Sequence, residues 1–261
     1  MSYSNIAIHI DDRGIATLCL SRPNKHNAMN DELIAEVTAA ARSLDSDSNV
    51  RAVVLTGAGD SFCAGGDLKW MQAMATATRS QRIAGSAQLA AMLRVLNELS
   101  KPLIGRINGA AYGGGTGMIS VCDIAIAADS ARFALTEIRL GLTPANIAPF
   151  VVARIGTANA RRCFLNALPM TAQKARELGL VDEVVPAAQL DAAVEKEIGY
   201  VLQCAPGAIA ATKKLIFHVA SHDLDASQAY TARLLADTWE TPEGQEGIRC
   251  FFAKQTPDWS R

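Results

Sequence analysis

The chain has 261 residues, of which 49% are hydrophobic and 20% charged, and its formal net charge is −1 at pH 7. This composition excludes disordered and collagen-like proteins, and the length allows a large hydrophobic core. No lysine- or arginine-rich stripe is present to neutralise phosphates, so nucleic acid is not expected to be the main partner.

Hydropathy and cysteine spacing bear on the cellular compartment. No stretch approaches 18 uninterrupted apolar residues, and the first residues lack the basic and apolar regions of a signal peptide. We therefore expect no membrane association and a cytoplasmic location. The six cysteines lie far apart without a CxxC pair, which indicates reduced core residues rather than zinc ligands or disulfides.

The N-terminal part of the sequence predicts a hairpin, a helix and a buried strand. Residues 5–23 contain two β-prone runs around Asp-Asp-Arg-Gly, which is typical of an antiparallel hairpin. Asn30 is expected to cap a helix that ends near residue 47. The apolar residues of this helix fall on one face: Leu33, Val37, Ala40, Ala41 and Leu44. A buried strand is expected over residues 50–57.

The following segment alternates helices with strands. A glycine-bearing loop over 57–66 precedes a long predicted helix through about Ser100, a strand at 102–108, a glycine-rich helix start and a strand at 123–128. This alternation predicts an α/β architecture with helices packed on sheet faces.

After about Thr143 strands nearly vanish from the pattern. Helices are expected over residues 188–204, 206–219, 226–240 and 244–254. We therefore expect a core domain over residues 1–195 and a helical region over residues 196–261, with a soft boundary near 185–205.

Motifs for nucleotides, calcium, zinc and serine hydrolysis are absent. The GxGxxG fingerprint fails at Phe62 and at Met118, the EF-hand pattern beginning at Asp45 lacks its glycine and glutamate, and neither HExxH nor GxSxG occurs. His218 and His222 have i,i+4 spacing, but such an isolated pair is more often solvated or structural than metal-binding. No metal site is predicted.

Two segments, residues 57–71 and 108–123, share a design in which a strand ends, glycines follow and a helix begins. Helix N-termini present unpaired N–H groups and partial positive charge, so two such starts facing one another are suited to hold an anionic oxygen. Glycine also lets a ligand approach the backbone closely. Spacing alone leaves open the alternative that these glycines only permit tight turns and close packing.

Glu137 lies between apolar stretches downstream of the second glycine-rich segment. A glutamate there is either exposed on a loop or poised in an apolar pocket, where desolvation would raise its pKa towards that of a useful proton carrier.

Four stretches identify the sequence as a member of the enoyl-CoA hydratase/isomerase (crotonase) superfamily, which they resemble in order and over nearly the whole chain. They are "LSRPNKHNAMN" (20–30), "LTGAGDSFCAGGDLKWM" (55–71), "INGAAYGGGTGMISVCDIAIAADSARFALTEIRLGLTP" (107–144) and "EGQEGIRCFFAKQTPDW" (243–259). The resemblance implies a crotonase-like α/β spiral of ββα units. It also implies a helical C-terminal region that forms a homotrimer or a hexamer built from two trimers.

The resemblance also implies an acyl-CoA thioester substrate, with coenzyme A arriving as part of that substrate and no resident cofactor. Carried over by position, the N–H groups of Gly66 and Gly114 would hold the thioester oxygen, and Glu137 would be the general acid/base. The positions matching the CoA contacts are Lys25, His26, Ala28, Ala64, Asp67, Leu68 and Lys69. Trp70 and Met71 are candidates for the acyl pocket, and Lys254 for a neighbouring subunit's CoA.

The sequence departs from the family pattern at Gly117, where hydratases of this family carry a second glutamate. One carboxylate is sufficient to move a proton between carbons, which favours a Δ3,Δ2-enoyl-CoA isomerase. The wider resemblance favours hydratases of methylglutaconyl-CoA or isohexenylglutaconyl-CoA, in leucine and terpene catabolism. We expect an enoyl-CoA hydratase (a lyase) of the methylglutaconyl type. The isomerase is the alternative within the superfamily, and a non-catalytic acyl-CoA-binding or RNA-associated protein is the alternative of another class.

Overall fold

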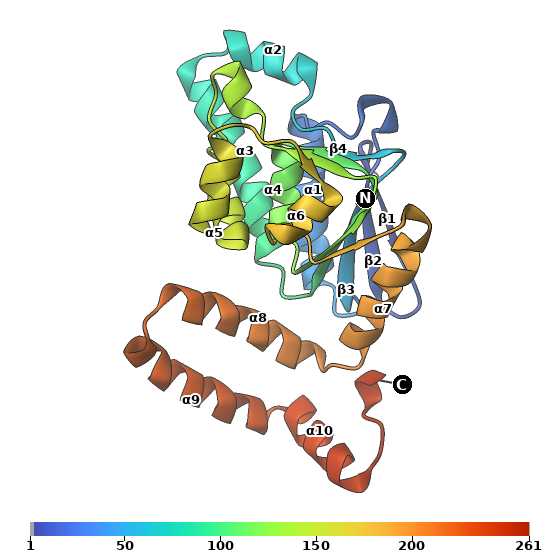
Figure 1. Ribbon diagram of the computed structural model, residues 1–261. Coiled ribbons are helices and arrows are strands. Elements are labelled where there is room, and N and C mark those ends of the chain that lie inside the picture. Colours follow the sequence, from blue (N-terminus) through green and yellow to red (C-terminus); the bar gives the residue numbers. More distant parts are fainter. Residues whose placement is uncertain (1–2, 261) are drawn as a thin grey trace.

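The computed structural model describes residues 3–260, which form a two-sheet body and a helical arm (Figure 1). Over these residues the larger sheet has six strands in the order β1-β2-β3-β5-β7-β10. Their bounds are β1 (Ile6–Ile10), β2 (Ile15–Leu20), β3 (Ala52–Gly57), β5 (Leu103–Ile107), β7 (Ile124–Ala128) and β10 (Glu183–Val185). The predicted hairpin is confirmed as the antiparallel pair β1 and β2, and the other neighbours are parallel.

The smaller sheet lies beside the first and has the order β4-β6-β8-β9 in the described chain. Its strands are β4 (Ser61–Cys63), β6 (Ala110–Tyr112), β8 (Arg132–Ala134) and β9 (Met170–Thr171). Three times in succession the chain passes from the larger sheet to the smaller one and then into a helix, as β3-β4-α2, β5-β6-α4 and β7-β8-α5. The expected spiral of ββα units is therefore present.

The helices of the body cover both faces of the larger sheet. They are α1 (Asp31–Ser46), α2 (Leu68–Thr76), α3 (Arg79–Asn97), α4 (Gly114–Ser120), α5 (Ala148–Phe164), α6 (Ala172–Glu177) and α7 (Leu190–Leu202). The Asn30 side chain caps α1 by accepting a hydrogen bond from the N–H of Leu33 at 3.0 Å, as predicted. The long helix expected through Ser100 is instead two helices, because the chain is extended at Ala77 and Thr78 and the Thr78 capping box starts α3 anew.

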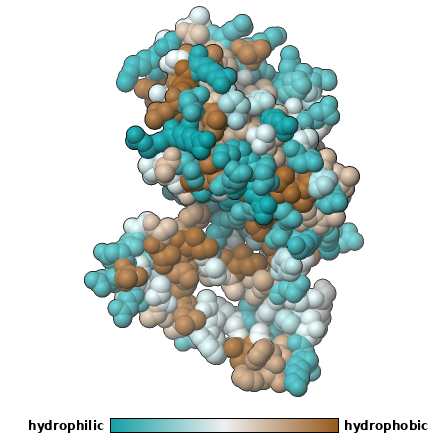
Figure 2. Space-filling model, in the orientation of Figure 1, coloured by the Kyte–Doolittle hydropathy of each residue, from teal (hydrophilic) through white to brown (hydrophobic). Residues whose placement is uncertain are grey.

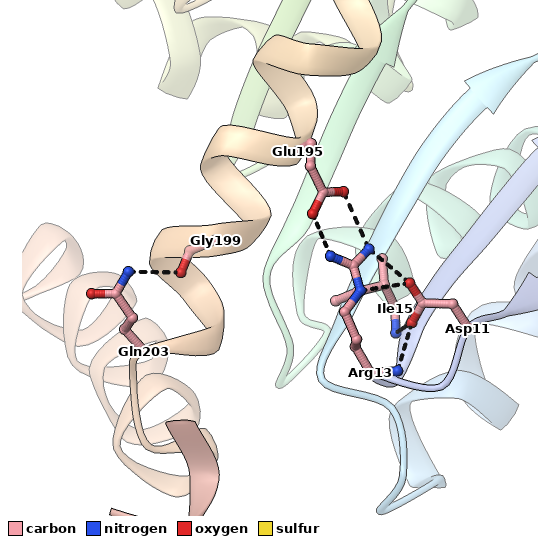
Figure 3. Close-up of polar contacts among 6 residues, drawn as sticks. All are labelled: Asp11, Arg13, Ile15, Glu195, Gly199 and Gln203. Atoms are coloured by element: carbon pink, nitrogen blue, oxygen red, sulfur yellow. Dashed lines mark hydrogen bonds and ion pairs between the residues drawn. The ribbon is translucent and has the colours of Figure 1, made fainter. Parts of the chain in front are cut away.

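Helix α7 covers the face of the larger sheet opposite α1 and forms a second core there. Its Ile198 and Val201 are buried together with strand residues such as Val54 and Ile126. Figure 3 shows the polar rim of this contact, where Arg13 in the hairpin turn pairs with Glu195 of α7. Residue 195 lies within this continuous helix, which ends at Leu202, inside the range of 185–205 expected for the soft boundary.

The arm consists of α8 (Pro206–Ser221), α9 (Leu224–Glu240) and α10 (Pro242–Ala253) and projects from the body (Figure 1). A partly buried ion pair fastens α8 to the body, since Lys213 Nζ lies 2.6 Å from Asp123 Oδ2 and also donates to the Lys101 carbonyl at 3.3 Å. Arg51 holds the other side of the junction by donating to the carbonyls of Cys204 and Trp259, each at 3.0 Å. None of the helices within residues 3–260 is both long and apolar enough to cross a bilayer.

We expect Lys213→Ala to destabilise the protein by about 1–3 kcal/mol, because the partly buried Asp123 carboxylate loses its charged partner and keeps only the hydrogen bond from the Leu103 N–H. Urea unfolding at fixed protein concentration measures the effect. The control is Lys174→Ala, whose more exposed ion pair with Glu177 is worth at most about 1 kcal/mol. Equal losses in the two variants would contradict a fastening role for Lys213.

Candidate active site

The two glycine-rich turns lie next to one another because the strands that lead into them are neighbours. Strands β4 and β6 are parallel, with Cys63 opposite Ala111. Beyond them the chain turns at Gly65 and Gly113, whose φ angles of 91° and 50° favour glycine. A Cβ atom added to Gly65 would lie 3.1 Å from the Tyr112 carbonyl oxygen. The two glycine-rich turns are therefore neighbours in space.

Both candidate donors lie at backbone positions where the local secondary structure does not use the N–H group. Gly66 pairs with Met29 in an isolated parallel bridge. The groups bonded in that bridge belong to Met29, Gly65 and Asp67, at 2.7 and 2.8 Å, so the Gly66 N–H is directed away from Met29. Gly114 is the first residue of α4, and first-turn N–H groups have no acceptor within their own helix.

The Glu137 carboxyl lies against the start of α4. Glu137 begins a 3₁₀ turn after β8, and the Gly113 N–H ties the two segments together by donating to the Ala134 carbonyl at 2.9 Å. A Cβ atom on Gly113 would lie 2.8 Å from Glu137 Oε1. Glu137 is thus half-buried beside the glycines rather than free on an exposed loop.

The Glu137 side chain has the electrostatic character of a proton carrier. Its Oε2 atom is buried and has no hydrogen-bond partner among the described residues. Desolvation by burial raises the pKa of Glu137, against a weaker lowering by its own backbone N–H. Perturbed carboxyl groups of this kind concentrate at functional sites.

The position of the missing second glutamate is filled by an apolar side chain. The Gly117 N–H donates to the carbonyl of Gly113, the N-cap residue, at 3.1 Å, so Gly117 lies one turn along α4 from the residue that the Glu137 carboxyl faces. A Cβ atom on Gly117 would lie 2.4 Å from Ile147 Cγ2, and Ile147 is only 2% exposed. One turn beyond the Glu137 carboxyl, α4 therefore contacts a hydrocarbon wall instead of carrying a second carboxylate.

The predicted CoA-binding positions come from two segments that lie side by side. The Ala64 N–H donates to the His26 carbonyl at 2.9 Å, and His26 Nδ1 lies 3.0 Å from Ser61 Oγ. Lys25, His26, Leu68 and Lys69 are exposed, Ala64 is partly exposed, and Ala28 and Asp67 are buried. The structure thus gathers these residues next to Gly66, and their contact with CoA stays a prediction.

Asp67 has a structural task that the sequence did not reveal. Its carboxylate accepts hydrogen bonds from the N–H groups of Lys69 and Trp70 and from Arg22 Nη2 at 3.0 Å. Burial would raise the pKa of Asp67, but the Arg22 bond and the two backbone bonds together lower it. Arg22 was missed because its partner is 45 residues away and neither residue has a distinctive local pattern.

The remaining candidates lie at different distances from the glycines. Met71 and Trp70 flank Gly66, since a Cβ atom there would lie 3.3 Å from Met71 Cγ and 3.7 Å from a Trp70 ring carbon. Their role in an acyl pocket stays a prediction. Lys254 caps the C-terminal end of α10, a helix of the arm, and its contact with the CoA of a neighbouring subunit stays a prediction.

The histidine pair in the arm forms an aromatic stack. The ring centroid of His218 is 4.0 Å from that of His222 and 3.8 Å from that of Tyr230. Across residues 3–260 no group of three or more histidine, cysteine, aspartate or glutamate side chains is arranged to hold a metal ion.

Comparison with known proteins shows which enzymes this chain resembles. The sequence profile described as "Enoyl-CoA hydratase/isomerase" matches residues 11–261. The "Probable enoyl-CoA hydratase echA8" of Mycobacterium bovis is 32% identical over 261 residues, covering 100% of this chain and 99% of the relative. The "2,3-dehydroadipyl-CoA hydratase" of Escherichia coli is 32% identical over 255 residues and 94% of each chain.

Solved structures show the same architecture. A crystal structure of an enoyl-CoA hydratase/isomerase from Marinobacter aquaeolei superposes with a TM-score of 0.94 at 35% identity, covering 98% of this chain and 99% of the other. The crotonase fold expected from the sequence is therefore confirmed.

We expect Glu137→Gln to stabilise the fold at neutral pH and above. Because the carboxyl binds its proton more tightly when folded, the native protein loses stability as pH rises past the ordinary glutamate pKa of about 4.3 and through the raised native value. The amide carries no charge and escapes this loss. Thermal unfolding of both proteins between about pH 4 and 8 should show the gain appearing as pH rises. A gain independent of pH would contradict the desolvated-carboxyl interpretation.

Proposed function

Because the chain belongs to the enoyl-CoA hydratase/isomerase family, we propose that it is an enoyl-CoA hydratase, which adds water to an α,β-unsaturated acyl-CoA thioester. The observation that carries the proposal is the Glu137 carboxyl, half-buried with one oxygen unpartnered, next to two glycine-rich helix starts. Hydratase is favoured over isomerase because the relatives named above are hydratases.

In the proposed reaction the N–H groups of Gly66 and Gly114 donate to the thioester oxygen. The negative charge that develops there is stabilised most in the enolate-like transition state. Loss of one donor in comparable oxyanion holes costs about 2.7–4 kcal/mol of activation free energy. Gly66 is partly exposed, whereas Gly114 is buried with the Met29 methyl group on its Cα side, so at position 114 glycine serves the close packing of the first turn of α4.

Glu137 is proposed to carry out both proton transfers of the reaction, which involve one and the same proton. Its carboxylate takes a proton from water as the water oxygen bonds to the β carbon, and the electron pair of the double bond shifts to the thioester oxygen as an enolate. The carboxylic acid then returns the proton to the α carbon, so that charge and atoms balance. The raised pKa of Glu137 suits this exchange, because a carboxyl whose pKa lies closer to neutral pH both accepts and returns a proton more readily.

The proposed substrate carries a free carboxylate in addition to its thioester, as 3-methylglutaconyl-CoA does. With Ile147 packed against Gly117, the chain supplies no second glutamate at α4 to orient the water. A carboxylate of the substrate, or a water ordered by it, would take over part of that task. The relative named for 2,3-dehydroadipyl-CoA acts on the thioester of a dicarboxylic acid, which agrees with this substrate class. Leucine catabolism would supply such a substrate.

Self-association through the arm is also part of the proposal. The arm leaves large apolar side chains uncovered, with Phe251 77% and Phe252 78% exposed, and Leu224 89% exposed at the tip. Figure 2 shows hydrophobic residues gathered on the visible face of the arm, in the lower half of the view. Apolar surface of this extent marks an interaction site. A homotrimer, alone or paired into a hexamer, would cover it.

We expect the purified protein to hydrate 3-methylglutaconyl-CoA at least about tenfold faster than crotonyl-CoA. One interaction of the substrate carboxylate that stabilises the transition state by ~1.4 kcal/mol produces a rate difference of this size. Loss of the conjugated-thioester absorbance measures the rate. Glu137→Gln should lower kcat by about 10²–10⁴-fold while CoA still binds. Equal rates on both substrates would reject the substrate class. Conversion of a 3-enoyl-CoA without addition of water would identify an isomerase instead.

Replacing Phe251 and Phe252 together by serine should convert the assembly into smaller species, because it removes apolar area that an interface would bury. Light scattering after size-exclusion chromatography measures the mass, expected for three or six chains in the parent. Ile83→Ser, which changes an exposed apolar side chain of the body, is the matched control. A monomeric parent would refute the proposed association.

A further inference from the structure

Met29 contacts both glycine segments of the candidate active site. Its backbone forms the bridge to Gly66, donating to the Gly65 carbonyl at 2.7 Å and accepting from the Asp67 N–H at 2.8 Å. Its side chain reaches Gly114, where an added Cβ atom would lie 2.1 Å from Met29 Cε and 3.5 Å from Sδ. Met29 is 3% exposed, so this thioether is packed between the two segments.

The backbone of Met29 is held firmly on both sides. Asn30 follows it and caps α1, which fixes the start of that helix. Before it, the Arg22 guanidinium donates to the Ala28 carbonyl and to Asp67 Oδ2. The side chains of the Arg22 and Asp67 pair are only 15% and 11% exposed, so water competes little with this bond. The segment carrying Met29 and the segment carrying Gly66 are thereby locked together.

The contact between the Met29 side chain and Gly114 is made by packing alone, beside the strand pairing of β4 with β6 that brings the two segments together. Helix α4 has seven residues, and the N-cap residue Gly113 makes no side-chain capping bond. The methyl group of Met29 occupies the volume that a side chain at position 114 would take. It therefore limits how closely the first turn of α4 approaches the Gly66 segment.

We propose that Met29 is a positioning residue that sets the separation of the Gly66 and Gly114 N–H groups. The inference rests on the proposed function, in which these two groups hold the thioester oxygen together. Misplacement of catalytic groups by about 1 Å costs up to about 10²-fold in rate. A spacer between the donors is thus expected to govern polarisation of the carbonyl, while CoA binding by the surrounding segments is unaffected.

The test compares two short replacements, Met29→Ala and Met29→Val, with the long replacement Met29→Leu. The short side chains do not reach Gly114, whereas leucine keeps most of the reach and the apolar character. We expect kcat to fall about 10- to 100-fold in the short variants. KM for the acyl-CoA should change less than about threefold, because those contacts are made elsewhere. Leucine should restore most of kcat.

A spectroscopic readout reports the donors directly. A conjugated arylacryloyl-CoA absorbs at longer wavelength when hydrogen bonds polarise its thioester carbonyl, so its red shift on binding measures the geometry of the two N–H groups. The shift should be smaller in Met29→Ala and Met29→Val than in the parent. Met170→Ala, which truncates another buried methionine beside Cys163, controls for lost stability and should keep the parental shift.

A compensating substitution adds a second test. Gly114→Ala places a methyl group against Met29 Cε in the parent, but into the vacated space in Met29→Ala. The double variant should therefore recover part of the red shift and kcat lost in Met29→Ala. If Met29→Ala and Met29→Val keep the parental shift and kcat, Met29 is not the spacer. If the parent itself shows no red shift, the oxyanion site of the proposed function is wrong instead.

Discussion

The site depends on close approach of two strand-to-helix turns, which is possible only where side chains are missing. A Cβ atom on Gly115 would lie 2.4 Å from the Cys63 carbonyl oxygen, and one on Gly114 would meet Met29. Each glycine inside a helix costs about 1 kcal/mol relative to alanine. That cost is offset because the bare backbone lets neighbouring strands place two N–H groups and one carboxyl together. The parallel pairing of β4 with β6 in the smaller sheet brings these turns side by side.

The same close packing decides the proton chemistry of the site. The Glu137 carboxyl rests against Gly113, partly removed from water, and Ile147 fills the space above Gly117. A glutamate at 117 would need Ile147 to move, so the loss of the second carboxylate is built into the packing of α4 against α5. Within residues 3–260 no charged group shifts the pKa of Glu137, and desolvation is the main influence on it. A single carboxyl then serves as both base and acid in the proposed reaction.

The chain separates this site from the surface proposed for association. The body buries its apolar residues in two cores, on either face of the larger sheet. The arm buries few of its own, and it is joined to the body by polar contacts such as Lys213 with Asp123. Hydrophobic burial stabilises the body from within, whereas the arm has apolar surface to bury against other chains. Lys254 sits in that arm, far from the glycines of its own chain.

The sequence by itself determined the local elements and the class of fold. Periodicity and capping located α1 from Asn30, the hairpin and the buried β3, and the family resemblance indicated Gly66, Gly114 and Glu137 as site positions. Tertiary structure alone decided which distant residues touch, because packing and desolvation depend on neighbours that are remote in the chain. It placed Arg22 on Asp67, Met29 on Gly114 and Ile147 on Gly117. It also decided that Glu137 is desolvated, which no local pattern encodes.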